Sequence, residues 1–194
     1  MPQPDQPRAD RPDRIGNAAA DLLTITMSRP ASLGPGRVIC VDGPAGSGKT
    51  TVADAVAGLS GSPVIHMDDL YAGWDGIAEG IAQFETILTP LVEGAAGSYR
   101  RYDWHRGEFA ETVLVPPAPL LVIEGVGSGA AAYSDLRTAL AWVDAPPQVR
   151  RARGIERDGD TFAPRWDEWA IAETDLFARE MTAARADIVV LTDD

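Results

Sequence analysis

Residues 43–50 read Gly43-Pro44-Ala45-Gly46-Ser47-Gly48-Lys49-Thr50 and directly follow the apolar run VICVD at residues 38–42. They fit the phosphate-binding pattern of a glycine, four residues and then Gly-Lys-Ser/Thr, in the strand-then-helix context that the pattern requires. The stretch after Lys49 carries apolar residues at i, i+3, i+4 and i+7, which is typical of an amphipathic helix. This arrangement predicts a binding site for the phosphates of a nucleoside triphosphate.

The residue types in this loop each have a physical role. Its glycines permit backbone angles closed to other residues, so that main-chain N–H groups can converge on an anion. The helix that begins near Lys49 directs the positive end of its dipole to the same place. We therefore expect a P-loop (Walker A) site in which Mg²⁺ is held by the Thr50 hydroxyl and the triphosphate by Gly43, Ala45, Gly46, Ser47, Gly48, Lys49, Thr50 and Thr51.

Length and composition limit the number of domains and the kinds of partner. At 194 residues with 45% apolar content, the chain can bury one core but is short for two. We expect a disordered tail over residues 1–14, an N-terminal helix and linker over 15–36, and one domain over 37–194. A formal net charge of -12 disfavours nucleic-acid and anionic-membrane partners. One cysteine, Cys40, allows no intrachain disulfide, and no signal or membrane span is visible, so a cytoplasmic location is expected.

From residue 37 onward, apolar runs alternate with amphipathic segments, as in a parallel sheet covered by helices. The expected strands are 38–42, 63–67, 120–124, 141–144 and 187–191. The expected helices are 15–28, 49–59, 76–91, 133–140, 147–157 and 164–184. Residues 98–115 break the alternation and are expected to form a small hairpin or a loop over the site. The predicted fold class is α/β, a three-layer fold with a mainly parallel five-stranded sheet, helices on both faces and a small lid.

Acidic residues follow the apolar runs where four of the expected strands end, at Asp42, Asp68, Glu124 and Asp144. Ligands of open α/β sheets bind outside these carboxyl ends. Glu124 fits a second-strand acid that positions magnesium near the P-loop. Asp68 is well placed to accept a proton from an attacking hydroxyl. For Asp144 a helix-capping role is favoured. For Asp42 a capping role and a functional role are equally open.

Residues 148–158, QVRRARGIERD, are rich in arginine for so acidic a chain. On a helix, Arg150, Arg153 and Arg157 share a face through their i, i+3 and i+7 spacing. Guanidinium groups suit phosphate oxygens, so this segment is expected to close over ATP as a lid. A solvated face paired with Glu156 and Asp158 is the other interpretation.

In the last long helix, by contrast, the spacing of the aromatic residues indicates a buried face rather than a stacking site. Trp166, Trp169, Leu176 and Phe177 recur at helical intervals over residues 164–184. The helix expected over 76–91 carries a similar apolar face. Both helices are therefore expected to pack on the sheet.

Together, these motifs resemble the uridine-kinase-like P-loop small-molecule kinases over roughly residues 37–191. In that family the strand after the P-loop helix ends in Asp-x-Phe-Tyr, whose aspartate is the catalytic base. The matching Asp68-Asp69-Leu70-Tyr71 implies that role for Asp68 and places in the substrate pocket for Asp69 and Tyr71. A Tyr-Asp-Phe segment with a nearby histidine lines the family's nucleoside pocket, and Tyr102-Asp103-Trp104-His105, followed by Arg106, is similar.

Two further matches complete the resemblance. The family's Glu-Gly after an apolar strand is matched by Glu124-Gly125, and its arginine-rich lid after a Val-Asp strand end is matched by residues 143–157. The resemblance implies an ATP-dependent kinase that transfers the γ-phosphoryl group to a hydroxyl of a small molecule such as a nucleoside. It implies catalytic roles for Lys49, Asp68, Arg153 and Arg157, ATP binding by Arg150, and Mg²⁺ binding by Thr50 and Glu124.

The chain also departs from the family. The acidic stretch that holds ribose hydroxyls has only Trp74-Asp75 as a nearby counterpart, and His105 lies closer to Tyr102 than the family spacing places it. Both differences count against uridine itself as the acceptor.

Other functions stay open at this stage. The acceptor could be a sugar acid, a pantothenate-like alcohol or a nucleotide phosphate, for which Arg100, Arg101 and Arg106 would supply a second basic cluster. A non-catalytic ATP-binding regulator is the alternative from another class. A GTP switch is disfavoured because no Asn-Lys-x-Asp element is present. The sequence leaves the oligomeric state open.

Overall fold

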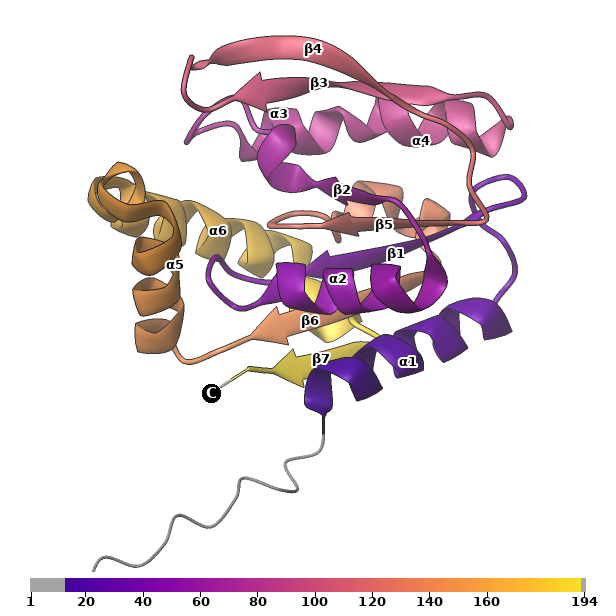
Figure 1. Ribbon diagram of the computed structural model, residues 1–194, viewed down its shortest axis with the longest axis horizontal. Helices are drawn as coiled ribbons and strands as arrows, with labels where there is room; N and C mark the ends of the chain where they lie inside the picture. Colours follow the sequence, from indigo (N-terminus) through magenta and orange to yellow (C-terminus); the bar gives the residue numbers. More distant parts are fainter. Residues whose placement is uncertain (1–12, 193–194) are drawn as a thin grey trace, which may run out of the picture.

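The structure, a computed structural model, describes residues 13–192, apart from the side chains of 158 and 160–162. Its centre is a five-stranded parallel sheet with the strand order β2-β5-β1-β6-β7 (Figure 1). The strands are β1 (Arg37–Asp42), β2 (Val64–His66), β5 (Leu120–Glu124), β6 (Ala139–Asp144) and β7 (Ile188–Leu191). All five strands that the sequence predicts are therefore present.

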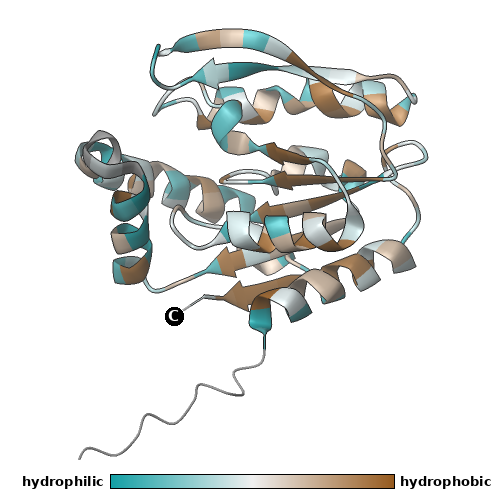
Figure 2. Ribbon diagram, in the orientation of Figure 1, coloured by the Kyte–Doolittle hydropathy of each residue, from teal (hydrophilic) through white to brown (hydrophobic). Residues whose placement is uncertain are grey.

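Alternate side chains of the central strands enter two separate cores. In β1, Val38 and Cys40 belong to one buried cluster, while Ile39 and Val41 belong to the other. This follows from the two-residue period of a strand, which directs successive side chains to opposite faces. Figure 2 shows these strands as the most hydrophobic part of the molecule, as expected for a sheet that is covered on both sides.

Helices cover both faces. The helices α1 (Arg14–Ser28) and α2 (Lys49–Ser60) supply apolar residues to the cluster that contains Ile39. The other cluster receives residues of α3 (Ile77–Ala82), α4 (Phe84–Val92) and α6 (Trp166–Glu180). The expected three-layer α/β fold is confirmed.

The N-terminal helix docks on its own domain. Asp13 caps α1 by accepting a hydrogen bond from the N–H of Gly16 at 2.9 Å. Ala19 and Leu22 of α1 are fully buried beside α2 and the sheet. Of the tail expected over residues 1–14, residues 1–12 lie outside the described part of the chain.

The segment that breaks the alternation forms an antiparallel hairpin, β3 (Gly97–Asp103) and β4 (Glu108–Val115). It lies beside α4 at one end of the sheet (Figure 1). The side chain of Gln83 fixes it there, because its oxygen accepts the N–H of Arg100 at 2.8 Å and its amide donates to the carbonyl of Leu70 at 2.9 Å. Of the two predicted alternatives, the hairpin is the observed one.

Three helix predictions need correction. The helix expected over 133–140 is instead a short 3-10 segment, η2 (Ala131–Leu136), and β6 begins at Ala139 because the apolar run from there pairs with β1. The helix expected over 76–91 is divided at Gln83. The helix expected over 164–184 begins with a 3-10 turn, η3 (Ala163–Arg165), and is interrupted at Met181, whose φ of 49° ends α6 before α7 (Thr182–Arg185).

The arginine-rich segment forms α5 (Pro147–Phe162), which stands at the carboxyl end of β6 (Figure 1). In Figure 2 it is mostly hydrophilic, unlike the helices that pack on the sheet. Within residues 13–192, no helix has the length and apolar character needed to cross a membrane.

Candidate functional site

A cleft of about 710 Å³ opens at the carboxyl ends of the central strands. Its lining includes the P-loop, the first turn of α2 and aromatic residues from three segments. Asp68, which follows β2, Glu124 at the end of β5 and arginines of α5 also contribute. The cleft therefore lies where open α/β sheets bind ligands.

The P-loop has the backbone that its glycines predict. Gly46 has a φ of 74°, and Gly48, with a φ of 91°, precedes the first residue of α2, Lys49. The Lys49 ammonium donates to the carbonyl of Pro44 at 2.9 Å, which folds the side chain over the loop. Of the predicted triphosphate-binding residues, Ala45, Gly46, Gly48, Lys49, Thr50 and Thr51 line the cleft. Gly43 and Ser47 are buried behind the loop surface.

The two residues predicted to hold magnesium lie together. The Thr50 hydroxyl donates to Oε1 of Glu124 at 3.2 Å, and the Glu124 carboxylate is buried. A hydroxyl and a carboxylate fit Mg²⁺. Proteins usually supply only one or two of its oxygen ligands, and water and substrate phosphates supply the others. Within the described residues, no group of three or more His, Cys, Asp or Glu side chains forms a separate metal site.

His66, the last residue of β2, is a site neighbour that the sequence analysis missed. Its Nδ1 lies 2.6 Å from Oε1 of Glu124, to which it is paired in the sheet register. This hydrogen bond raises the pKa of His66, although partial burial opposes it. The register of two strands distant in sequence creates the contact, and only a model of the strand order could have predicted it.

Asp68 lies on a 3-10 turn, η1 (Met67–Asp69), directly after β2. Its side chain lines the cleft together with Lys49, so the acid and the cation share one cavity as the sequence predicts. The main-chain carbonyl of Asp68 accepts a hydrogen bond from the indole N–H of Trp104 at 2.8 Å. The hairpin therefore helps to hold the segment that carries this acid.

The neighbours of Asp68 are placed differently. Asp69 is half-buried outside the cleft lining, and burial raises its pKa. Tyr71 is fully buried, and its hydroxyl donates to the carbonyl of Val126 at 2.7 Å. The hydroxyl is thus engaged in the structure, while the side chain forms part of the cleft wall.

The two remaining strand-end acids have structural contacts. The buried Asp42 carboxylate accepts the N–H groups of Gly43, Gly127 and Gly129 at 2.7, 3.0 and 2.8 Å. Desolvation raises its pKa to about 6, although these N–H groups favour the ionised form. Asp144 accepts the N–H of Ala145 at 2.8 Å. Asp42 therefore joins the start of the P-loop to the loop that follows β5. Asp144 does not cap α5 as expected, because the N-cap residue of that helix is Pro146.

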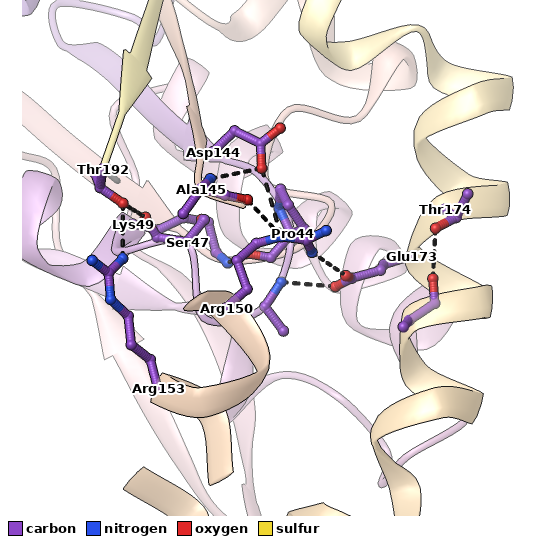
Figure 3. A network of polar contacts seen from close by, with 12 residues as sticks. Pro44, Ser47, Lys49, Asp144, Ala145, Arg150, Arg153, Glu173, Thr174 and Thr192 are labelled. Atoms are coloured by element: carbon purple, nitrogen blue, oxygen red, sulfur yellow. Dashed lines mark hydrogen bonds and ion pairs between the residues drawn. The ribbon is translucent and has the colours of Figure 1, made fainter. Parts of the chain in front are cut away.

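The arginines of α5, the expected lid, divide into two groups. Arg153 and Arg157 line the cleft, and Arg153 also donates to the hydroxyl of Thr192 at 3.0 Å. Arg150 lies behind the P-loop, where it donates to the carbonyl of Ala145 at 3.0 Å and to Glu173 at 3.3 Å (Figure 3). The structure therefore brings two of the three predicted arginines to the cavity.

Four aromatic side chains form a continuous group, which we call the aromatic wall: Tyr71, Trp74, Trp104 and Trp169. Each ring meets the next edge-to-face, with centroid distances of 4.9 Å for Trp74–Trp104, 6.1 Å for Trp74–Trp169 and 5.2 Å for Tyr71–Trp169. All four line the cleft. Trp169 was predicted to be a core residue and is indeed buried, but it also belongs to this wall.

The predicted hairpin residues only partly reach the cleft. Trp104 and His105 line it, whereas Tyr102 packs edge-to-face on Trp104 and Phe109. The basic residues of the hairpin are engaged by its own side chains. Arg100 stacks over the Phe109 ring, Arg101 pairs with Glu111 at 2.7 Å, and Arg106 pairs with Glu108 at 3.1 Å.

No protein-family model and no curated protein sequence matches the chain. Solved structures do match it. A possible uridine kinase from Bacillus stearothermophilus aligns with 92% of this chain and 97% of its own, at 23% identity and a TM-score of 0.62. A candidate fructose transport system kinase from Silicibacter sp. TM1040 aligns over 90% and 98%, at 19% identity and the same TM-score.

A D-glycerate 3-kinase from Cryptococcus neoformans var. grubii extends the comparison to a third acceptor. It covers 89% of both chains at 14% identity, with a TM-score of 0.54. These neighbours differ in the small molecule that their names specify and agree in their architecture. The resemblance stated from the motifs is therefore confirmed as a resemblance in fold, and the chain has the fold of the P-loop small-molecule kinases.

Proposed function

We propose that this protein is an ATP-dependent kinase that transfers the γ-phosphoryl group to a hydroxyl of a small molecule. The observation that carries the proposal is the single cleft that holds the P-loop Lys49, the Thr50–Glu124 pair and the Asp68 carboxylate. Phosphoryl transfer requires alignment of the reactants and neutralisation of charge more than covalent chemistry. These groups supply both requirements.

Each group has a distinct task in this proposal. Main-chain N–H groups of residues 46–50 and the α2 N-terminus hold the phosphates, and Lys49 is displaced from the Pro44 carbonyl to reach them. Thr50 and Glu124 would hold magnesium, which would supply positive charge to neutralise the transferred group. Asp68 accepts the proton of the acceptor hydroxyl. Arg153 and Arg157 stabilise the moving negative charge.

The acceptor side favours an uncharged hydroxyl compound over a nucleotide phosphate. A phosphate acceptor requires cations near its binding site. The three hairpin arginines that could supply them are instead paired with Glu111 and Glu108 or stacked on Phe109. Among hydroxyl compounds, we propose a nucleoside, because the aromatic wall offers ring surfaces on which a planar base can pack.

An ADP-release assay with nucleosides, sugars, sugar acids and vitamin alcohols tests this function. We expect ADP formation above the rate of ATP hydrolysis with at least one nucleoside, and a phosphorylated product detectable by mass spectrometry. The Asp68→Asn variant should lose about 10²–10⁴-fold in turnover, the usual contribution of a general base, while its affinity for MgATP stays nearly unchanged. MgATP binding without product from any acceptor would instead support the non-catalytic regulator.

A further inference from the structure

A buried carboxylate that the proposed function does not use lies behind the P-loop. Glu173 of α6 has a side chain that is only 2% exposed, although the residue is charged. Its Oε2 accepts the main-chain N–H of Ala45 at 2.8 Å, and its Oε1 accepts from Arg150 at 3.3 Å (Figure 3). A buried carboxylate is costly unless such partners compensate it.

The contact bears directly on the shape of the P-loop. Ala45 is the third residue of the GPAGSGKT segment, immediately before the glycines that turn the loop. Its N–H points to Glu173 and is therefore not among the donors available to phosphate. The loop is fixed at this point by a side chain from α6, 128 residues away in sequence.

A second contact holds the same region. A Cβ atom on Gly46 would lie 2.2 Å from the main-chain oxygen of Arg150, so α5 packs directly against the loop. The Arg150 guanidinium returns to Glu173 and also lies 3.6 Å from Asp144. Loop, α5 and α6 thus meet at one carboxylate.

We propose that Glu173 is a positioning residue for phosphoryl transfer, which holds the P-loop in its phosphate-binding curvature by accepting the Ala45 N–H. This inference rests on the proposed function. Glu173 also lies one helical turn after Trp169, so the helix that fixes the loop carries part of the aromatic wall. One helix therefore contacts both the P-loop and the aromatic wall.

Three variants of α6 test the inference. Glu173→Ala removes the acceptor of the Ala45 N–H, whereas Glu173→Gln keeps an oxygen at the same position. Glu168→Ala is the matched control, because Glu168 is exposed on α6, where it pairs with Arg165 at 2.7 Å. The first readout is MgATP affinity by calorimetry, and the second is hydrogen exchange of a peptide covering residues 43–50.

We expect Glu173→Ala to weaken MgATP binding about ten-fold, as when a buried N–H loses its acceptor, and to speed hydrogen exchange in the loop. Its Michaelis constant for the acceptor should change less than that for ATP. Glu173→Gln should restore ATP affinity to within about three-fold of wild type, and Glu168→Ala should match wild type. A merely structural role would lower the melting temperature of Glu173→Ala without this split between the two substrates.

Two results would overturn the inference. Wild-type MgATP affinity in Glu173→Ala would show that the Ala45 contact does not position the loop, while the kinase function would stand. Equal losses of MgATP affinity in Glu173→Gln and Glu173→Ala would show that MgATP binding depends on the negative charge of Glu173 and not on its hydrogen bond to Ala45. If the wild-type protein binds no MgATP, the proposed function fails first and this inference falls with it.

Discussion

The two sides of the cleft are built in different ways. The proposed phosphate side is one continuous segment, residues 43–51, whose sequence follows a strict pattern because phosphate binding by a P-loop relies on its backbone. The acceptor side combines Tyr71 and Trp74 with Trp104 of the hairpin and Trp169 of α6. A function that depends on main-chain N–H groups constrains local sequence, whereas a wall of side chains constrains only their final positions.

The largest expected effect comes from adding a methyl group to each side. In Gly46→Ala the new Cβ would lie 2.2 Å from the Arg150 main-chain oxygen, so the loop must shift. In Gly107→Ala, at the hairpin turn, the nearest atom is the Tyr102 hydroxyl at 3.9 Å. Both glycines have positive φ, 74° and 69°, so the backbone strain of about 1–2 kcal/mol is similar. Only the clash differs.

We therefore expect Gly46→Ala to weaken MgATP binding more than about 100-fold, and Gly107→Ala to leave it unchanged. Calorimetric titration of both variants, each checked for folding by circular dichroism, measures the difference. If both substitutions weakened MgATP binding equally, the close approach of α5 to Gly46 would not be the reason that this position requires glycine.

The next effect concerns Thr50 and Glu124, the residues proposed to hold magnesium. Glu124→Gln keeps the size of the side chain but removes the negative charge beside Thr50 and His66. We expect the Mg²⁺ concentration for half-maximal turnover to rise about 10–100-fold, with little change in the Michaelis constant for the acceptor. A Mg²⁺ titration of initial rates measures this. The control is Glu111→Gln, which removes a charge from the exposed hairpin surface; a matching rise there would point to a general electrostatic effect.

The same contrast explains what could be predicted from the sequence. The P-loop, the Thr50–Glu124 pair and Asp68 were predictable because each follows an apolar strand in a parallel sheet, and such strand ends share one edge. The contribution of Trp169 to the aromatic wall was not, since its helical spacing is that of a core residue. Glu173 was equally hidden, because a single glutamate within a helix gives no signal of the loop it contacts.

A moderate effect is expected on the acceptor side. Trp104 lines the cleft and its indole N–H bonds the Asp68 carbonyl. Trp104→Ala should raise the Michaelis constant for the acceptor about ten-fold through lost ring contact, and Trp104→Phe, which keeps a ring but loses the N–H, about three-fold. The Michaelis constant for ATP should stay unchanged in both. Phe109→Leu, which alters hairpin packing outside the cleft lining, serves as the control, and an equal effect there would reduce Trp104 to a packing role.

The smallest expected effect is the sharpest test of acceptor charge. Arg101 and Arg106 form ion pairs with Glu111 and Glu108 on the exposed hairpin, and such surface pairs contribute little to stability. Since neither arginine lines the cleft, the double variant Arg101→Ala/Arg106→Ala should keep both Michaelis constants within about two-fold of wild type. Steady-state kinetics with the best acceptor from the screen measures this. A loss of ten-fold or more confined to the acceptor would mean that these cations leave their glutamates to bind it, and would favour a nucleotide phosphate over an uncharged hydroxyl compound.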